Sequence, residues 1–410
     1  MGLNDTPKGD RIHIALFGRR NAGKSSLINA ITDQNLSIVS QVKGTTTDPV
    51  YKAMELLPLG PVMMIDTPGL DDEGELGEQR IEKTKEVLHK TDVALLVLTD
   101  EGKEEGYRLE AQIASMLEER EIPMIVVWNK ADSYDYSDTP HFSFFGKAPV
   151  MKVSAVTKEG VFELKECIGA QLPEDKPEVP IVQDLIKPGD FVVLVIPIDS
   201  AAPKGRLILP QQQTIRDILE KNAVPVVTRE NGLAETLKNL GKKPALVITD
   251  SQAFASVSKD TPEEVLLTSF SILFARHKGN LAELVKGANR LKELRDGDTV
   301  LISEGCTHHR QCDDIGTVKI PRWITEYTGK KIRFETSSGN SFPENLDKYA
   351  LVVHCGGCML NQREMQYRIR HAANSNVPIV NYGVLIAMVT GILKRSLEVF
   401  PDICKTLEEP

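Results

Sequence analysis

Near-continuous apolar runs alternate with helical patterns along the first third of the chain. Strands that are apolar on both faces are typical of parallel sheets covered by helices on each side. Five such runs lie at 12–18, 62–69, 92–100, 123–132 and 148–155. Between the third and fourth runs, one helix face is predicted by the spacing of Leu109, Ile113, Met116 and Leu117. The pattern therefore predicts an α/β domain with a mostly parallel sheet.

A linker separates this part from two further α/β stretches. Residues 172–180 hold three prolines and three acids without periodicity, which indicates an extended connection. Further strands are predicted at 190–199, 225–230, 245–250, 298–304, 331–336, 350–354 and 378–382. Two intervening helices carry apolar stripes, namely Ile215, Ile218 and Leu219, then Leu233, Leu237 and Leu240. We predict an α/β fold of three domains, at 8–172, 178–267 and 268–410.

Composition and charge narrow the functional classes. Of the 410 residues, 41% are hydrophobic and 26% are charged, which is typical of globular proteins. No apolar run approaches the roughly 18 residues that a membrane span needs, and the first residues lack a signal-like apolar core. We therefore expect a soluble, cytoplasmic protein without a membrane partner. The net charge of −9 offers no general attraction to phosphate backbones, so no nucleic acid partner is expected.

The first predicted strand ends in a phosphate-binding pattern. Residues 18–26 read GRRNAGKSS and fit G-x-x-x-x-G-K-[ST] between a strand and a helix. In such a loop the backbone amides surround the phosphates, Lys24 neutralises phosphate charge, and the Ser25 hydroxyl binds Mg²⁺. The predicted nucleotide contacts in this loop are Gly18, Asn21, Ala22, Gly23, Lys24, Ser25 and Ser26.

Three other predicted strand ends carry polar motifs that complete a guanine nucleotide site. DTPG at 66–69 offers Asp66 to Mg²⁺ through water and the Gly69 amide to the γ-phosphate. NKAD at 129–132 offers a carboxylate that accepts both donors on the Watson–Crick edge of guanine. The predicted base contacts are Asn129, Lys130, Asp132, Ser154 and Ala155. Because ligands bind at the carboxyl edge of open parallel sheets, the four strand ends predict one GTP site.

These motifs and their order resemble the translation-factor-like GTPases, in particular the branch that contains Era and MnmE. The resemblance implies that GTTTD at 44–48 is the switch I segment, with Thr46 as a second Mg²⁺ ligand and Thr45 and Thr47 as alternatives. It also implies that Asn21 binds K⁺, as an asparagine does in potassium-activated relatives, with an ordinary loop amide as the alternative. The predicted catalytic residues are Lys24, Thr46, Asp66 and Gly69.

One catalytic element of the Ras-type enzymes is missing. The residue after DTPG is Leu70, where those enzymes carry a glutamine that orients the attacking water. The acids that follow, Glu73, Glu75 and Glu78, are candidates for positioning this water instead. We therefore expect slow intrinsic hydrolysis of GTP.

A second concentration of chemical groups lies nearer the C-terminus. The six cysteines are Cys167, Cys306, Cys312, Cys355, Cys358 and Cys404. EGCTHHRQCDD begins at 304 and HCGGC at 354, so each motif follows a predicted strand. In a parallel sheet both loops lie at one edge and can share a metal. We expect Cys167, Cys312 and Cys404 to be dispensable for it.

Two kinds of metal site fit these ligands. Zinc accepts three cysteines and one histidine, or two of each, in a tetrahedron. An iron–sulfur cubane accepts three thiolates and leaves one iron for a weaker ligand, for which His308, His354, Asp313 or solvent is available. The two glycines between Cys355 and Cys358 let both thiolates reach one centre. Buried cysteines without a metal are a third alternative.

The complete arrangement resembles the HydF family of iron–iron hydrogenase maturation GTPases. C-x-H, 45 intervening residues and H-C-x-x-C follow the GTPase motifs, and the segments 195–219 and 269–281 are similar to that family as well. The resemblance implies a GTP-binding, a dimerisation and an iron–sulfur cluster domain. The implied [4Fe–4S] ligands are Cys306, Cys355 and Cys358, with His354, His308 and Asp313 as candidates for the fourth position.

The resemblance also implies a function and partners. A homodimeric scaffold would hold a di-iron subcluster precursor and transfer it to the iron–iron (FeFe) hydrogenase apo-enzyme, together with the radical-SAM maturases HydE and HydG. The alternative is a GTPase of RNA or ribosome maturation with a structural zinc. The net charge and the lack of an evident RNA-binding module weigh against that alternative.

Overall fold

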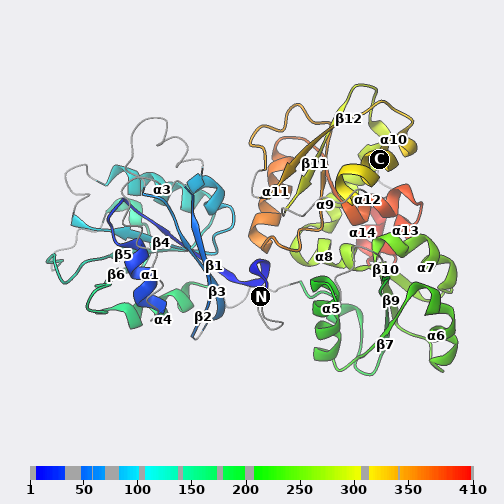
Figure 1. The fold of residues 1–410 in the computed structure, drawn as a ribbon, viewed down its shortest axis with the longest axis horizontal. Helices are drawn as coiled ribbons and strands as arrows, with labels where there is room; N and C mark the ends of the chain where they lie inside the picture. Colours follow the sequence, from blue (N-terminus) through cyan, green and yellow to red (C-terminus); the bar gives the residue numbers. More distant parts are fainter. Residues whose placement is uncertain are drawn as a thin grey trace. The chain divides into compact units, whose positions relative to one another are not determined.

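The chain forms two compact units, Met1–Lys176 and Pro177–Pro410 (Figure 1). The computed structural model describes residues 6–32, 48–57, 59–69, 83–100, 107–136, 142–172, 179–198, 207–305, 314–339 and 342–407. Within these segments, no helix combines the length and the apolar character needed to cross a membrane.

The first unit is built on a six-stranded sheet in the order β2-β3-β1-β4-β5-β6. Its strands are β1 (Ile12–Phe17), β2 (Val50–Leu56), β3 (Gly60–Asp66), β4 (Val93–Leu98), β5 (Met124–Trp128) and β6 (Val150–Lys152). The five predicted strands run parallel, so their carboxyl ends lie at one edge. The edge strand β2 pairs antiparallel with β3. It escapes prediction because most of its residues are exposed or half-buried and form no apolar run.

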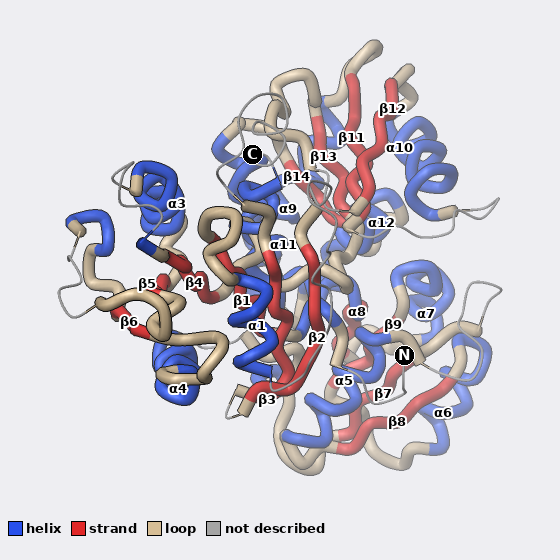
Figure 2. Tube along the Cα trace, turned by 60° about the vertical axis from the view of Figure 1, so that its left-hand side comes forward, coloured by secondary structure: helices blue, strands red, loops and turns tan. Residues whose placement is uncertain are grey.

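Helices cover both faces of this sheet (Figure 2). Those whose full bounds the structure describes are α1 (Lys24–Thr32), α3 (Arg108–Glu119) and α4 (Val161–Gln171). Leu16 shares one core cluster with α1 and α4, and its neighbour Phe17 shares another with α3. Both faces of the strands are therefore apolar, which explains the unbroken apolar runs. The predicted face of α3 is confirmed, with Ile113 and Leu117 buried and Leu109 and Met116 half-buried.

The second unit contains two four-stranded parallel sheets. The first has the order β10-β9-β7-β8, and the second has the order β12-β11-β13-β14. Their strands are β7 (Phe191–Val195), β8 (Val224–Thr228), β9 (Leu246–Thr249), β10 (Leu266–Ser269), β11 (Thr299–Glu304), β12 (Arg333–Ser338), β13 (Leu351–His354) and β14 (Ile379–Asn381). All seven predicted strands form, and the short strand β10 is additional.

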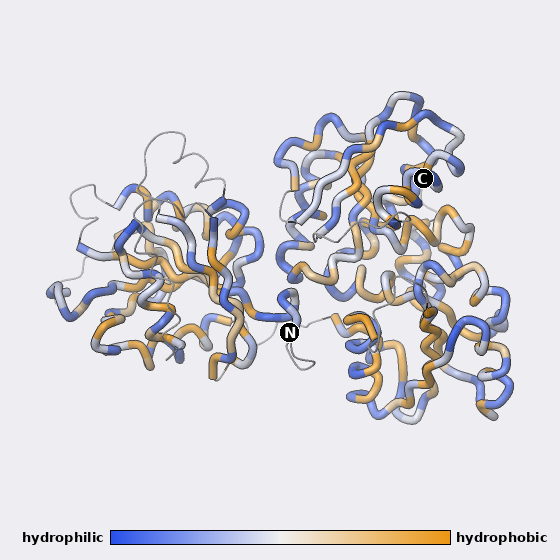
Figure 3. Tube along the Cα trace, in the orientation of Figure 1, coloured by the Kyte–Doolittle hydropathy of each residue, from blue (hydrophilic) through white to orange (hydrophobic). Residues whose placement is uncertain are grey.

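One continuous core runs through both sheets of the second unit. It joins Val193 of β7 and Val352 of β13 through residues of the helices between the sheets, such as Leu284 and Leu385. Figure 3 shows the apolar positions concentrated along the strands and the helices that cover them. The helices are α5 (Leu209–Glu220), α6 (Leu233–Asn239), α7 (Phe254–Asp260), α8 (Phe270–Lys278), α9 (Leu281–Asn289), α10 (Ile320–Thr328), α11 (Gln362–Asn374), α12 (Tyr382–Val389), α13 (Leu393–Leu397) and α14 (Pro401–Lys405).

One predicted helix stripe is wrong in part. Ile218 of α5 is fully buried, but Leu219 is 52% exposed. The inward position two turns before Ile218 belongs to the polar Gln211, whose Oε1 accepts from the Ile208 amide at 3.1 Å and whose Nε2 donates to Asp250 Oδ2 at 2.9 Å. A polar side chain can occupy the core when its hydrogen bonds are satisfied, and apolar spacing alone does not reveal this.

Gly287 sets how closely α9 approaches β14. A Cβ atom at this position would lie 1.9 Å from the carbonyl oxygen of Ile379. We predict that Gly287→Ala lowers the free energy of unfolding of the second unit by about 3 kcal/mol, because the helix must move away from the sheet. Urea unfolding followed by circular dichroism measures the change. Lys286→Ala, at an exposed position of the same helix, is the control. Equal stability of the two variants would contradict the close approach.

Candidate functional site

The loop between β1 and α1 is shaped to hold phosphates. Gly18 and Gly23 have φ angles of +153° and +85°, and a Cβ atom at either position would lie within 2.4 Å of another residue. Lys24 is 6% exposed, and its Nζ donates to the carbonyl oxygens of Gly18 and Arg19, each at 2.8 Å. These bonds hold the ammonium group within the loop, where its charge can act on bound phosphates. Asn21 is exposed, with a φ angle of +62°.

The two predicted Mg²⁺ groups of this site lie together. Ser25 Oγ donates to Asp66 Oδ2, so the hydroxyl and the carboxylate are adjacent although they come from α1 and the end of β3. A Cβ atom at Gly69 would lie 2.7 Å from the amide nitrogen of Arg20, so DTPG closely approaches the phosphate loop. Thr46 and the segment 70–82 lie outside the described residues.

Asn129 joins the phosphate end of the site to the base end. Its side chain is buried, and its Nδ2 donates to the carbonyl oxygen of Ala22 at 2.8 Å. Its Oδ1 accepts from the Ala155 amide at 3.3 Å. One amide side chain thereby ties the loop after β1 to the loop after β6. The next residue, Lys130, has a φ angle of +64°.

Asp132 presents the carboxylate predicted to recognise guanine. The side chain is exposed, and Ser154 Oγ donates to its Oδ1 at 2.5 Å. This bond, with a second one from Ser133 Oγ at 2.9 Å, holds the pKa of the Asp132 carboxyl below its ordinary value. An ionised carboxylate only accepts hydrogen bonds, which is the role that two guanine donors require.

A buried ion pair behind the phosphate loop was missed by the sequence analysis. Arg19 Nε donates to Glu110 Oε1 of α3 at 2.8 Å, and the two side chains are 9% and 2% exposed. Burying charges is costly unless they are closely paired, so this contact holds α3 to the loop. Arg19 occupies a variable position of the phosphate-loop pattern, and Glu110 belongs to no motif. Residue type and spacing therefore carried no signal for the pair.

The parallel pairing of β11 and β13 brings two distant segments together. Ser303 of β11 pairs with His354 of β13. Beyond these strands, the backbone N–H of Gly305 donates to Cys355 Sγ at 3.0 Å. Gly305 is the residue that directly precedes Cys306 in the sequence. The described chain therefore holds Cys355 against the residue next to the predicted third cysteine ligand.

The loop between Cys355 and Cys358 has the conformation of a tight turn. Gly357 has a φ angle of +64°, and its amide donates to Cys355 Sγ at 3.4 Å. Burial raises the pKa of the Cys358 thiol, and the neighbouring charge of Cys355 adds to the rise, whereas Lys278 acts in the opposite direction. Lys278 is itself only 4% exposed. A bound cation beside Cys358 would oppose this rise and favour the thiolate form.

His354 is fully buried and both of its ring nitrogens are engaged. Nδ1 lies 2.7 Å from the carbonyl oxygen of Cys355, and Nε2 lies 3.0 Å from Nη1 of Arg368. Arg368 also contacts Glu364 of the same helix, α11. The sequence analysis assigned no role to either charged residue. Their helical spacing is that of an ordinary surface pair, whereas the structure buries both.

The remaining predicted metal ligands cannot be placed. Cys306, His308 and Asp313 lie outside the described residues. In the part of the chain that is described, no three His, Cys, Asp or Glu side chains come together as a metal site. Within the described segments, neither Cys355 nor Cys358 forms a disulfide. The shared metal centre therefore stays a prediction.

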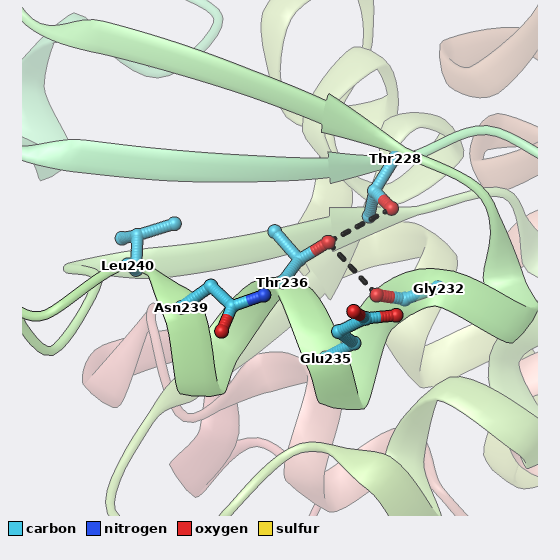
Figure 4. Close-up of a pocket in the computed structure, with 6 residues that line it drawn as sticks. All are labelled: Thr228, Gly232, Glu235, Thr236, Asn239 and Leu240. Carbon is cyan, nitrogen blue, oxygen red and sulfur yellow. Dashed lines mark hydrogen bonds between the residues drawn. The ribbon is translucent and has the colours of Figure 1, made fainter.

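The first sheet of the second unit offers a shallow pocket of about 440 Å³ (Figure 4). It lies between the end of β8 and α6 and is lined by Thr228, Gly232, Glu235, Thr236, Asn239 and Leu240. Thr236 Oγ1 lies within hydrogen-bonding distance of Thr228 Oγ1, at 3.0 Å, and of the carbonyl oxygen of Gly232, at 2.8 Å. These hydroxyls satisfy one another, and Glu235 is the one carboxylate in the lining. The pocket carries no catalytic constellation.

Three protein-family models match the chain. Residues 13–130 match the 50S ribosome-binding GTPase model. Residues 181–279 match the hydrogen maturase F dimerization domain, and residues 282–399 match the hydrogen maturase F tetramerization domain. The two hydrogen maturase F models together span more than half of the chain. The C-terminal segment, for which a cluster domain was predicted, is thus described in that family as an assembly domain.

Curated relatives support the GTPase branch. GTPase Der of Sulfurimonas denitrificans is 33% identical over 175 residues, which is 40% of this chain and 35% of that protein. GTPase Der of Solidesulfovibrio magneticus is 31% identical over 262 residues, which is 60% of this chain and 56% of that protein. The tRNA modification GTPase MnmE of Koribacter versatilis is 36% identical over 156 residues, which is 38% of this chain and 33% of that protein. The chain spans 56% or less of each relative.

The matches and the geometry agree on the organisation of the chain. The N-terminal match contains the phosphate loop, DTPG and the start of NKAD, which the six-stranded sheet brings to one edge. The two remaining matches cover the two parallel sheets of the second unit. With a GTPase domain followed by the dimerization and tetramerization domains of hydrogen maturase F, the chain belongs to the HydF family of hydrogenase maturation GTPases.

Proposed function

We propose that this chain is a GTP-hydrolysing scaffold of FeFe-hydrogenase maturation that binds a [4Fe–4S] cluster and holds a di-iron subcluster precursor for transfer to the apo-hydrogenase. The observation that carries the proposal is the 3.0 Å hydrogen bond from the Gly305 amide to Cys355 Sγ, in a chain of the HydF family. It fixes one thiol of C-x-x-C beside the residue that precedes Cys306. Three thiolates from two such loops are what a site-differentiated cubane needs.

The nucleotide site supports hydrolysis of GTP with Mg²⁺. Lys24 is held in the phosphate loop, Ser25 and Asp66 are adjacent, and Asp132 is ionised for guanine. Thr46 would complete the Mg²⁺ coordination. Asn21 is the proposed K⁺ ligand on the basis of its resemblance to the asparagine of potassium-activated GTPases, and its side chain is exposed. A bound K⁺ would supply the positive charge that an arginine finger gives in other GTPases.

The thiols of Cys355 and Cys358, which form no disulfide in the described part of the chain, are suitable donors for a cluster. A cubane on three thiolates has one iron with an exchangeable ligand, which suits temporary attachment of a cargo. Both ring nitrogens of His354 are already engaged, which argues against this residue as the fourth ligand. His308, Asp313 and solvent remain as the proposed occupants of the fourth position.

Self-association is part of the proposed function. Two of the matched domain models carry the names dimerization and tetramerization. β8 is an edge strand of its sheet, and Val224 and Val227 on it are 42% and 51% exposed. An unpaired strand edge with apolar side chains is a surface that a second copy can cover. We therefore propose a homodimer or a larger homo-oligomer.

The proposed partners follow from the family role. They are the FeFe-hydrogenase apo-enzyme and the radical-SAM maturases HydE and HydG, and the proposed location is the cytoplasm. GTP would order the switch segments that contain Thr46 and follow Asp66, whereas hydrolysis would release them, and docking of a partner could depend on that difference.

Asp132→Asn is predicted to change the nucleotide preference. An amide cannot accept both guanine donors as a carboxylate does, so GTP affinity should fall about 100-fold while xanthosine triphosphate binding improves. Competition against a fluorescent nucleotide measures both affinities. Ser133→Ala, which removes a hydrogen bond to the same carboxylate but leaves the carboxylate itself, is the control. An unchanged preference in Asp132→Asn would refute this role of the residue.

Cys355→Ser is predicted to abolish the cluster and to spare GTP hydrolysis. Anaerobic reconstitution with iron and sulfide should give the wild-type chain a visible charge-transfer absorption and an electron paramagnetic resonance signal after reduction, and the variant neither. Cys404→Ser, in α14, should behave as the wild type does. Stoichiometric zinc without these signals in the wild-type chain would instead support the RNA or ribosome maturation alternative.

Val227→Lys is predicted to lower the oligomeric state. A charge on the exposed edge of β8 opposes strand pairing between copies. Sedimentation velocity across a range of protein concentrations should show a smaller species for this variant. Phe162→Lys places the same charge at a 70% exposed apolar position of α4 and serves as the control. If both variants sediment like the wild type, β8 is not the self-association edge.

A further inference from the structure

A buried guanidinium group packs behind the cysteine loop and is used neither by the nucleotide site nor as a predicted ligand. Arg368 of α11 is 1% exposed. Its Nη2 donates to Glu364 Oε1 at 2.7 Å and to the carbonyl oxygen of Gly339 at 2.9 Å, and its Nη1 donates to His354 Nε2 at 3.0 Å. The guanidinium carbon lies 5.2 Å from the ring centre of Phe342. A buried charge is costly, so these contacts hold it in one orientation.

The partners of His354 define which ring nitrogen carries the proton. A guanidinium group only donates hydrogen bonds, so Nε2 must accept from Arg368. A carbonyl oxygen only accepts, so Nδ1 must donate to the oxygen of Cys355, 2.7 Å away. The ring is therefore neutral with its proton on Nδ1, and neither nitrogen has a lone pair left for a metal.

We propose that Arg368 is a positioning residue for the cluster loop, because it locks His354 as a hydrogen-bond donor to the Cys355 backbone and keeps that ring from binding iron. This inference rests on the proposed function in so far as it concerns a cluster. The part that concerns the protonation of His354 does not depend on a bound metal.

The lock contributes to a set of contacts that fixes the whole loop. The amide of Cys355 donates to the carbonyl oxygen of Ser303 at 2.9 Å, and its Sγ accepts from Gly305. The loop ends at Asn361, whose side chain caps α11 by accepting from the Glu364 amide at 3.0 Å. Glu364 is the residue that pairs with the buried guanidinium. The same network therefore holds both ends of the segment that carries Cys355 and Cys358.

The first test uses the full-length chain without metal. Nuclear magnetic resonance of a sample with ¹⁵N- and ¹³C-labelled histidine reports which nitrogen carries the proton, and His354→Asn identifies the signal. We expect the Nδ1–H form in the wild-type chain and a mixture of both neutral forms in Arg368→Met. Arg370→Met, at an exposed position of the same helix, should keep the wild-type form. An Nε2–H form in the wild type, or no change in Arg368→Met, would overturn the proposal.

The second test uses the reconstituted chain. Loss of a group that orients a ligand typically costs 10- to 100-fold in metal affinity, so Arg368→Met should release iron to a ferrous chelator about 10-fold faster than the wild type and Arg370→Met. His354→Asn should retain the cluster, because its amide can still donate to the Cys355 carbonyl. Loss of the cluster in His354→Asn, or equal release from all variants, would overturn the proposal.

Failure of the proposed function and failure of the role of Arg368 can be distinguished. If the wild-type chain takes up no cluster, the proposed function fails, and the histidine measurement on the metal-free chain still decides the role of Arg368. If Arg368→Met does not fold because Glu364 is left charged and buried, Arg368→Met with Glu364→Gln removes that charge. Glu364→Gln alone keeps the guanidinium in place and should keep the Nδ1–H form. Loss of that form in Glu364→Gln would assign the lock to the carboxylate instead and overturn the proposal.

Discussion

Parallel strand pairing is the constraint on which both sites depend. When strands run parallel, every strand ends at the same edge, so residues that are distant in the sequence meet there without any direct attraction between them. In the first unit this brings Gly23, Asp66 and Asn129 to one edge. In the second unit the pairing of Ser303 with His354 does the same for the two cysteine-bearing segments. A slip of one residue between β11 and β13 would separate Gly305 from the Cys355 sulfur.

Buried polar side chains turn this common edge into defined geometry. Asn129 joins two loops of the nucleotide site through both ends of its amide, and the pair Arg19–Glu110 holds α3 to the phosphate loop. Arg368 plays the corresponding part behind the cysteine loop. Burying any of these groups without its hydrogen-bond partners costs free energy, so the paired arrangement is favoured over others. The strands bring the loops together, and the buried polar groups set how the loops are held.

The two units differ in how their cores are built. In the first unit the sheet separates two apolar clusters, one on each face, whereas one core continues through both sheets of the second unit. The strand edge at β8 and the cysteine loop after β13 therefore belong to one packed body. Close-packed interiors have low compressibility and transmit strain. A displacement in one sheet of that body is therefore transmitted to the other.

The sequence by itself determined the α/β class, the strands with unbroken apolar runs, the order of the GTPase motifs and the family resemblance. Those features are local, because a doubly covered strand must be apolar and a phosphate loop needs glycine at fixed positions. The sequence did not predict β2, β10 or the exposure of Leu219, since each depends on which neighbouring element covers the residue. Only the tertiary structure decided that Glu110 and Arg368 are buried and that both nitrogens of His354 are engaged. The sequence predicts that charged residues on a helix lie at the surface, and it does not reveal that another element packs over them. The hydrogen-bond partner of a histidine depends on distance in space rather than on position in the chain.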